Sequence, residues 1–451
     1  MENALTYQWI WVLAFGLVFF FLSPLSTTAK EFFAAQGKEG KEPGMFMLIT
    51  SLVISWIFAK SITNAADLGM SYGIVGGVGY GVYYLSFVVA GFVIYRMRSK
   101  GGFTSIHQFL NSKFGRVGVV LFSLLIAFRL FNEVWSNSMV IGSYFGEVGS
   151  AQFYWSIVIF TALTLAYVLK GGLRSSLLTD AIQMLLFGLL LILIFSFIWP
   201  KTVGGLDTYL SSGEWRWGAG LNFMLAAFLQ IFSYPFHDPV LTDRAFITKP
   251  KVMLKGFVLA SVIGFACILL FSFVGVFAAQ EGLVGSSTVQ VSKMLGLGGM
   301  LSMNFIMVTS AASTLDSAFA SFSKLMVIDL KVVRSHSISA GRLVMIAMAI
   351  LGTLPVFMNP AILSATTISG TMVIGLAPVF LLWNFKAGPL SFLLSVLTGV
   401  VFGALLATGA VPDWWLLTKG AHADFLWCNV WGLLACFAMY FSPFFFKFLS
   451  R

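Results

Sequence analysis

Long apolar runs alternate with short polar connections along the whole chain. Each run is apolar over about 20 residues, the length at which an α-helix crosses roughly 30 Å of hydrocarbon. The approximate cores of these runs are 7–25, 45–71, 74–97, 117–146, 151–170, 175–199, 218–240, 252–279, 297–328, 340–358, 361–384, 389–409 and 424–447. The pattern predicts an all-α polytopic membrane protein with about 13 transmembrane helices.

The composition supports this class and excludes a soluble domain. Hydrophobic residues make up 59% of the 451 positions and charged residues only 10%, whereas soluble domains carry about 25% charged residues. Cys267, Cys428 and Cys436 lie in apolar runs, so we expect buried small side chains and neither disulfides nor metal ligands. The first run has an acidic start and no basic segment before it, which predicts a retained helix and not a signal peptide.

The net charge of +10 reflects basic residues in short loops and does not indicate nucleic-acid binding. One set of alternate connections holds Lys30, Lys38, Lys41, Arg96, Arg98, Lys100, Lys113, Arg116, Lys170, Arg174, Arg244, Lys249, Lys251, Lys255, Lys331, Arg334, Lys386, Lys447 and Arg451. The other set holds Lys201, Arg216, Lys293 and Lys419. The side rich in basic residues is expected to be cytoplasmic. We therefore predict a multi-pass protein of the cell (inner) membrane, with its N-terminus outside and its C-terminus in the cytoplasm.

Two runs are predicted to be interrupted helices. The second reads SLVISWIFAKSITNAADLG over 51–69, and the seventh reads LQIFSYPFHDPVLTDR over 229–244 with Pro235 and Pro239. An interrupted helix exposes backbone groups that are tolerated in a membrane only where they line a cavity or bind a ligand. Interruptions at corresponding places in two halves of a chain are typical of transporters built from inverted repeats, with the binding site near the midplane.

Ionisable residues inside spans are candidates for function, because they are costly when they face lipid. The sequence offers Lys60, Arg129, Glu133, Asp180 and Asp316. Arg129 and Glu133 are four apart and can pair on one helix face, which Asn137 continues; the pair is either structural or part of a substrate site or gate. Asp180 lies two turns inside its helix, too deep for an N-cap, which favours a cation pathway.

A dense group of hydroxyls stands out in TSAASTLDSAFA, residues 309–320. Ser310, Ser313, Thr314 and Ser317 recur at spacings of three and four, so they share one helix face beside Asp316. Such hydroxyls often bond to carbonyls of their own helix. Four on one face exceed that explanation and, with carbonyls from an interrupted helix, suit a monovalent cation that must leave again, since hard cations prefer oxygen ligands.

Four stretches give the chain a resemblance to the sodium:solute symporter family over nearly its whole length. They are AKEFFAAQGK, FTSIHQFLNSKFG, LKGGLRSSLLTDAIQ and ASTLDSAFASFSKLMVIDL. The resemblance implies a secondary transporter with the fold of the leucine transporter, in which two inverted five-helix repeats form a core of spans two to eleven. The implied organisation is an extra helix and loop over 1–43, repeats over 44–200 and 201–386, and two further helices over 387–451.

The resemblance also implies ligands for sodium. The matching positions are the carbonyls of Ile54, Ile57 and Ser310 and the hydroxyls of Ser313 and Thr314.

Some relatives bind a further sodium ion, and Asp180 and Ser317 match that pattern. We group Asp316 with them as a second cation site or ion pathway. Two residues depart from the family pattern, Lys60 and Asp316, and we hypothesise that they pair across the site. Residues expected at the substrate or gate are Lys60, Ser61, Tyr234, Glu133 and Asn137, of which Tyr234 matches an aromatic inner gate.

These observations predict a sodium-coupled symporter that imports a small organic solute by alternating access. Lys60 and Arg129 favour a solute that bears a carboxylate. One alternative is a sodium-independent or proton-coupled carrier in which Lys60 replaces a cation. Another is a transporter-like membrane sensor, disfavoured because such proteins usually carry a soluble domain and this sequence ends soon after its last run.

No enzyme is predicted, because the four histidines are scattered and no phosphate-binding loop is present. Expected partners are a small solute, sodium as the coupling ion and the bilayer, with no other cofactor and no nucleic acid. Substrate identity, sodium number and oligomeric state stay open.

Overall fold

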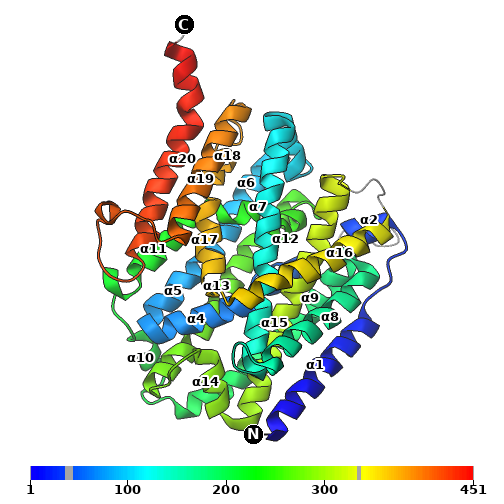
Figure 1. Cartoon of the computed structure of the whole chain (residues 1–451), viewed down its shortest axis with the longest axis vertical. Coiled ribbons are helices and arrows are strands. Elements are labelled where there is room, and N and C mark those ends of the chain that lie inside the picture. The colour runs from blue at the N-terminus through cyan, green and yellow to red at the C-terminus, as the bar shows by residue number, and fades with distance from the viewer. Residues whose placement is uncertain (1, 36–43, 333–336, 450–451) are drawn as a thin grey trace. The chain divides into compact units, whose positions relative to one another are not determined.

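The computed structural model describes residues 2–35, 44–332 and 337–449, and its regular elements over these ranges are helices (Figure 1). Ten of the described helical segments are long and apolar enough to cross a membrane. They are α1 (Glu2–Leu22), the run of α5 (Ile74–Gly81), η1 (Val82–Leu85) and α6 (Ser86–Gly101), α7 (Ile106–Phe145), α8 (Ala151–Gly171), α9 (Leu173–Ile198), α13 (Pro250–Gln280), α15 (Gly296–Lys324), α16 (Ile338–Thr353), α19 (Pro389–Ala407) and α20 (Ala423–Leu449). The all-helical membrane class is confirmed.

The remaining predicted spans are made of shorter pieces. The second is the pair α3 (Met45–Ile54) and α4 (Ala59–Tyr72), which bend by 57° at their junction. The seventh consists of α11 (Leu221–Gln230), η4 (Tyr234–His237) and α12 (Pro239–Arg244). Both predicted interruptions are therefore present, and the predicted count of about 13 spans is met approximately.

The eleventh predicted span is also divided, which the sequence analysis did not single out. It consists of α17 (Ser364–Met372) and α18 (Leu376–Leu381). Between them, Gly375 lies so close to α19 that an added Cβ would fall 2.2 Å from the carbonyl oxygen of Ser395. The Ser395 hydroxyl donates to the Gly375 carbonyl at 2.7 Å, so the exposed backbone finds a partner on the neighbouring helix.

Short helices connect the spans. They include α2 (Ala29–Ala34), α10 (Gly205–Leu210) and α14 (Ser287–Met294), together with η2 (Trp199–Lys201), η3 (Trp217–Ala219), η6 (Leu354–Met358) and η7 (Asp413–Trp415). A π-helical turn, η5 (Leu325–Asp329), follows α15. Of the basic loop residues, Lys38, Lys41, Arg334 and Arg451 lie outside the described residues, as does the side chain of Lys447.

The chain divides into two compact units. Unit 1 comprises Met1–Gly77, Leu130–Gly213 and Ala266–Ile362, and unit 2 comprises Val78–Arg129, Glu214–Phe265 and Leu363–Arg451. Each unit takes segments from both predicted repeats, whose boundaries stay a prediction. Within unit 1, α15 packs against α9, α14, α8 and α16, and 94% of its most apolar window is buried.

Glycines fix the position of α4 within unit 1. An added Cβ on Gly275 of α13 would lie 1.7 Å from the Ala66 carbonyl oxygen, and one on Gly69 would lie 2.1 Å from that of Ser272. The backbones of α4 and α13 are therefore in direct contact, which only residues without a side chain permit.

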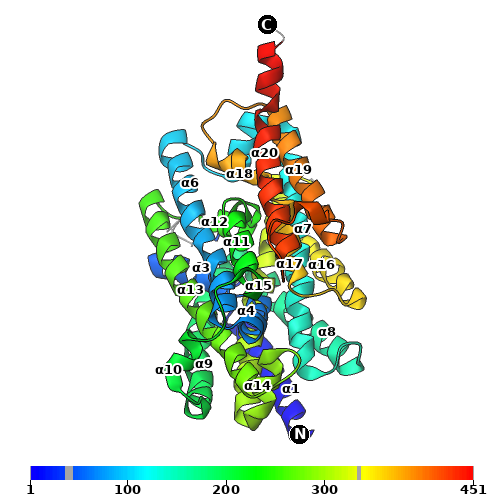
Figure 2. The same ribbon diagram turned by 90° about the vertical axis from the view of Figure 1, so that its left-hand side faces the viewer.

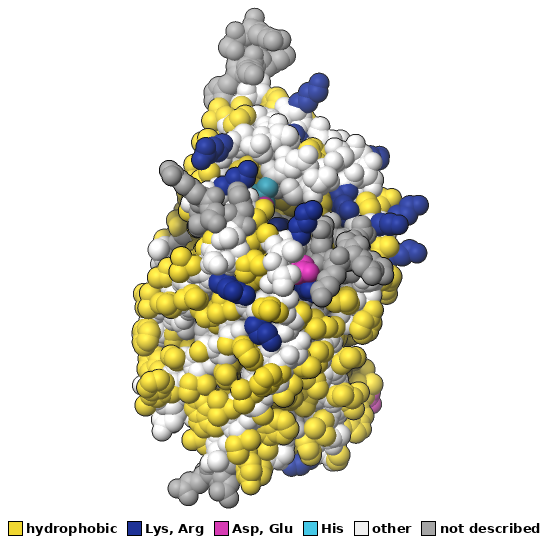
Figure 3. All heavy atoms as spheres, turned by 90° about the vertical axis from the view of Figure 1, so that its right-hand side faces the viewer, with side chains coloured by type: hydrophobic (Ala, Val, Ile, Leu, Met, Phe, Trp, Pro, Cys, Tyr) yellow, Lys and Arg dark blue, Asp and Glu magenta, His cyan; other side chains and the backbone are white. Residues whose placement is uncertain are grey.

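One face of the molecule shows how the surface suits a bilayer. On the face in Figure 3, hydrophobic side chains cover a broad area in the lower half, and most of the Lys and Arg side chains lie in the upper half. Large apolar side chains such as Leu189, Ile192 and Phe21 are 67–77% exposed. In water such a surface is unfavourable, whereas lipid tails cover it at no cost.

Candidate transport site

The interruption of the second span leaves two buried carbonyl groups available. Across it, the amide of Ser55 donates to the Ser51 carbonyl at 3.1 Å, and that of Ile57 donates to the Val53 carbonyl at 2.9 Å. The carbonyls of Ile54 and Ile57 accept none of the backbone hydrogen bonds described here, although both residues are fully buried. Buried carbonyls normally have partners, so these two predicted sodium ligands fit an ion.

Asp180 of α9 joins this interruption to α15. Its carboxylate accepts hydrogen bonds from Ser51 at 2.5 Å, Ser55 at 3.3 Å and Ser313 at 2.5 Å. These donors come from the end of α3, the residue after it and the hydroxyl face of α15. A residue predicted for a second ion site therefore contacts Ser313, a residue predicted for the first.

The other hydroxyls of α15 have mixed partners. The Thr314 hydroxyl donates to the Ser310 carbonyl at 2.9 Å, so these two predicted ligand atoms bond to each other. This is the back-bonding arrangement common for hydroxyls on helices. The Ser310 hydroxyl is buried and makes no hydrogen bond with the described residues.

Asp316 lies on the same helix in a shell of hydroxyls. It accepts hydrogen bonds from Tyr167 at 2.7 Å, Ser176 at 2.8 Å and Thr179 at 2.9 Å, and Ser176 also bonds with Ser317 at 2.9 Å. Its carboxyl group is thus hydrogen-bonded by residues of α8 and α9, as a buried polar group requires. Asp316 and Ser317, predicted together, do share a network.

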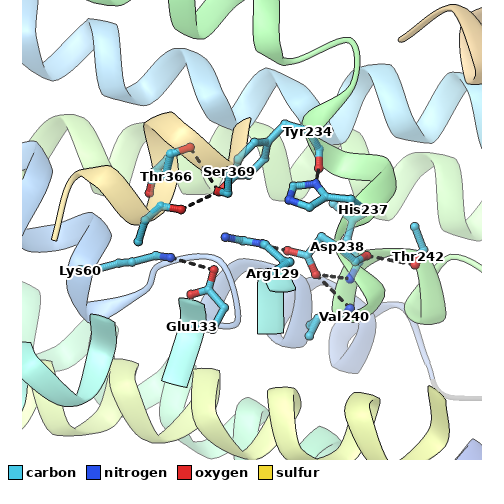
Figure 4. A network of polar contacts seen from close by, with 12 residues as sticks. Lys60, Arg129, Glu133, Tyr234, His237, Asp238, Val240, Thr242, Thr366 and Ser369 are labelled. Carbon is cyan, nitrogen blue, oxygen red and sulfur yellow. Dashed lines mark hydrogen bonds and ion pairs between the residues drawn. The ribbon is translucent and has the colours of Figure 1, made fainter. Parts of the chain in front are cut away.

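The hypothesised pair of Lys60 and Asp316 is wrong. Lys60 Nζ donates to Glu133 Oε1 at 2.8 Å, with the two side chains 0% and 5% exposed (Figure 4). The physical reason is that Asp316 already has three hydroxyl donors, whereas Glu133 of α7 needs a cation.

Asn137 connects the members of this ion pair. Its amide donates to Glu133 Oε2 at 3.1 Å, and its Oδ1 accepts from the Lys60 backbone N–H at 3.1 Å. This N–H belongs to the first turn of α4, where Phe58 as N-cap offers no side-chain acceptor. Lys60, Glu133 and Asn137 are therefore brought together in the structure, and Ser61, which follows Lys60 on α4, is buried.

The interruption of the seventh span, in unit 2, has its own ion pair. Asp238 accepts hydrogen bonds from the backbone N–H groups of Val240 at 2.9 Å and Leu241 at 3.3 Å, which caps α12. Arg129 Nη2 lies 3.2 Å from Asp238 Oδ2, and its guanidinium lies 4.9 Å from the ring centre of Tyr234 (Figure 4). Arg129 thus has an acidic partner other than the predicted Glu133.

The sequence analysis missed Asp238, although a signal was present. An aspartate followed by proline is a typical helix start, because proline suits the first helical position and aspartate the N-cap.

A second missed group lies at the end of α11 in unit 2. Gln230 accepts from Tyr83 at 2.7 Å and donates to Thr371 and Asn429 at 3.0 Å each. The signal was an amide within each of two apolar runs, which lipid would disfavour. The network ties the interrupted α11 to α17 and α20.

Comparison with known proteins shows which family part of the chain resembles. Residues 39–214 match the model of the sodium:solute symporter family. No curated protein sequence matches the chain.

Solved structures match over almost the whole length. A Na+-coupled sialic acid symporter in a substrate-bound outward-open state is 17% identical, with a TM-score of 0.67 and 97% of each chain covered. MhsT in complex with L-phenylalanine is 15% identical, with a TM-score of 0.58, and covers 89% of this chain and 100% of its own.

Mhp1, a nucleobase-cation-symport-1 family transporter, is 14% identical, with a TM-score of 0.57 and 94% of each chain covered. At these identities the likeness concerns the fold. The chain thus resembles the sodium:solute symporter family over residues 39–214 and has a leucine-transporter-like fold over almost its whole length.

Proposed function

We propose that the chain is a sodium-coupled symporter that imports a small organic solute by alternating access. One observation carries this proposal: the Asp180 carboxylate bonds to Ser51 and Ser55 at the interrupted helix and to Ser313 on α15. A carboxylate, several hydroxyls and buried carbonyls around one point are what a hard cation prefers.

Sodium would be held by the carbonyls of Ile54, Ile57 and Ser310 and the hydroxyls of Ser313 and Thr314. The Thr314 hydroxyl donates its proton to the Ser310 carbonyl, which leaves the lone pairs of its oxygen for the ion. Asp180, Asp316 and Ser317 would form a second cation site or the ion's exit path. Asp180 would compensate the charge of a sodium ion at either place.

Sodium binding would be coupled to the conformation of unit 1 through the helices that this site joins. The ligands come from both sides of the 57° junction and from α15, so sodium binding would favour the arrangement in which these elements lie together. A ligand shifts a conformational equilibrium only by its difference in affinity between the two states. Sodium would therefore stabilise one state of unit 1 and set the geometry in which the solute binds.

The solute would bind beside the interrupted helix of unit 1, with Lys60, Ser61, Glu133 and Asn137 as contacts, while Tyr234 of unit 2 stays a predicted gate residue. A solute carboxylate would compete with Glu133 for the Lys60 ammonium. The Lys60–Glu133 pair also argues against the alternative function, a carrier in which Lys60 replaces a cation. The Lys60 ammonium already pairs with Glu133 at 2.8 Å.

The expected setting is the cell (inner) membrane, with the N-terminus outside and the C-terminus in the cytoplasm. The uneven distribution of basic loop residues supports this orientation.

Thermal unfolding of the purified protein tests the proposal. The unfolding temperature should rise with sodium and not with potassium or choline at equal ionic strength, because a ligand that binds only the folded state stabilises it. The rise should vanish in Ser313→Ala plus Thr314→Ala. Thr309→Ala is the matched control, since that hydroxyl bonds to the Phe305 carbonyl of its own helix. An equal response in the double variant and wild type would overturn the assignment of the site.

A screen of solutes in the same assay would then define the substrate. Solutes that raise the unfolding temperature only in the presence of sodium are candidates for transport in reconstituted vesicles. A carboxylate-bearing solute should lose its effect in Lys60→Met.

A further inference from the structure

A carboxylate outside the proposed transport site has unusual surroundings. Asp67 lies on α4, eight residues beyond its start at Ala59 and hence about 12 Å further along the helix. Its Oδ1 accepts both the backbone N–H of Ser287 at 2.8 Å and the Ser287 hydroxyl at 2.6 Å. Asp67 thus caps α14, which lies beside α4 in both ribbon views (Figures 1 and 2).

Hydroxyl groups without partners surround this cap. The hydroxyls of Tyr144, Ser286 and Thr288 are buried and make no hydrogen bond with the described residues. Tyr144 is 8% exposed and Thr288 is 0% exposed. The Tyr144 hydroxyl lies near the Thr288 hydroxyl and the Asp67 carboxylate, but it makes no hydrogen bond with either group.

The charge of Asp67 has no basic partner among the described residues. Its Oδ1 is occupied by Ser287, and no described donor bonds to Oδ2. Hydroxyls can donate to an anion or offer lone pairs to a cation. Beside a carboxylate an anion is repelled, whereas a hard cation gains from the carboxylate and the hydroxyl oxygens together.

We propose that Asp67, Tyr144, Ser286 and Thr288 form a further, outer binding site for a monovalent hard cation, for which sodium is the natural candidate. The site lies within unit 1, on the same helix as the proposed transport site. In the proposed orientation α4 ends on the outer side of the membrane, and the site lies toward that end. An ion bound here would also hold α14 against α4, because its ligands come from both helices and from the end of α7.

Equilibrium binding of radioactive sodium to the full-length protein in detergent, without any solute, tests this proposal. Ser313→Ala plus Thr314→Ala removes the inner site, and sodium that still binds occupies the outer site or the cation site proposed at Asp180, Asp316 and Ser317. Asp67→Asn distinguishes these two, because only the outer site contains Asp67. Adding Asp67→Asn should weaken that remaining binding by about tenfold or more, the scale seen when a ligand or its supporting group is removed. Adding Tyr144→Phe plus Thr288→Val should weaken it too, with the Asp67–Ser287 cap kept.

Ser71→Ala is the matched control, because the Ser71 hydroxyl bonds to the Asp67 backbone carbonyl at 2.9 Å and lies on the exposed side of α4. It should leave binding unchanged. Size-exclusion profiles establish that each variant folds.

The outcomes separate this proposal from the proposed function. Sodium binding that disappears entirely with the inner site overturns the outer site and supports the transport site. Binding that survives in the inner-site variant and is lost with Asp67→Asn supports the outer site. If Tyr144→Phe plus Thr288→Val binds sodium as its parent does, Asp67 is a helix cap only and the proposal is wrong.

Discussion

The two interrupted helices differ in how their breaks are held. The break at η4 in unit 2 contains Pro235 and Pro239, and Asp238 caps the following α12 with its own side chain. The break at 55–58 in unit 1 has no proline, and its N-cap Phe58 contributes no side-chain hydrogen bond. There the polar groups are satisfied by Asn137 and Asp180, which lie far away in the sequence.

The difference teaches that one break is specified locally and the other by tertiary contacts. Proline removes a backbone donor and interrupts a helix wherever it stands. The break in unit 1 depends on other helices, because Asn137 and Asp180 bond to its polar groups, and its Ile54 and Ile57 carbonyls stay open to a ligand. We therefore expect the break in unit 1 to respond to ions.

The largest effect should follow from Glu133→Gln, which leaves the fully buried Lys60 ammonium without its carboxylate. Removing one partner of a buried ion pair typically costs about 3–5 kcal/mol. Thermal unfolding in detergent should show this cost as a large drop in the unfolding temperature. Replacing both charges with Lys60→Met plus Glu133→Gln should recover most of the loss. A double variant as unstable as the single one would show that the pair is not what Glu133 contributes.

A smaller effect is expected from Asn137→Leu, which removes the acceptor for the Lys60 N–H and a donor to Glu133. Leaving such buried groups unsatisfied costs about 1–3 kcal/mol, again measured by thermal unfolding. Ser143→Ala is the control, because that hydroxyl bonds only to the Val140 carbonyl of its own helix at 2.7 Å. Equal stability of Asn137→Leu and wild type would refute the tertiary account of the break in unit 1.

Because the break in unit 2 is specified by local residues, two variants of Asp238 should differ modestly in stability. Both Asp238→Asn and Asp238→Ala lose the charge opposite Arg129, but asparagine still caps α12. The alanine variant should therefore be less stable by about 1 kcal/mol, the usual contribution of a helix cap. Variants of equal stability would show that the cap is not needed once Pro239 is present.

The smallest expected effect is on the stability of the protein at acidic pH, and it comes from Glu31, which lies outside both breaks. The hydrogen bond from the Thr27 N–H and the nearby Arg174 guanidinium lower the pKa of Glu31 from 4.5, against the opposing effect of burial. A folded-state pKa below the unfolded one gives stability that is present above pH 4.5 and lost as the pH falls through the folded value. Glu31→Gln should flatten the fall of unfolding temperature in that acidic range, while both breaks stay intact.

The sequence predicted those parts of the fold that depend on length and local chemistry. Apolar runs gave the spans, and Pro235 and Pro239 marked the second break. The division of α17 from α18 was missed, because it depends on the approach of Gly375 to α19, which no local pattern reveals.

The candidate site was predictable where several signals coincided. Ser313, Asp180 and Asp316 stood out because polar groups in apolar spans need partners. The pairing was less predictable: Lys60 bonds to Glu133 and not to Asp316, since pairing depends on which helices pack together. Asp238 and the Gln230 network were missed because a helix cap and an amide are weak signals in a sequence.

The buried Lys60–Glu133 pair also bears on how membrane voltage acts on this protein. Moving one elementary charge through the full membrane potential involves about 2.3 kcal/mol per 100 mV. A lysine and a glutamate that move together transfer no net charge, so voltage does no work on them, and the same holds for Arg129 with Asp238. These two pairs therefore contribute no current to the proposed transport cycle, whereas the bound ions and a charged solute can.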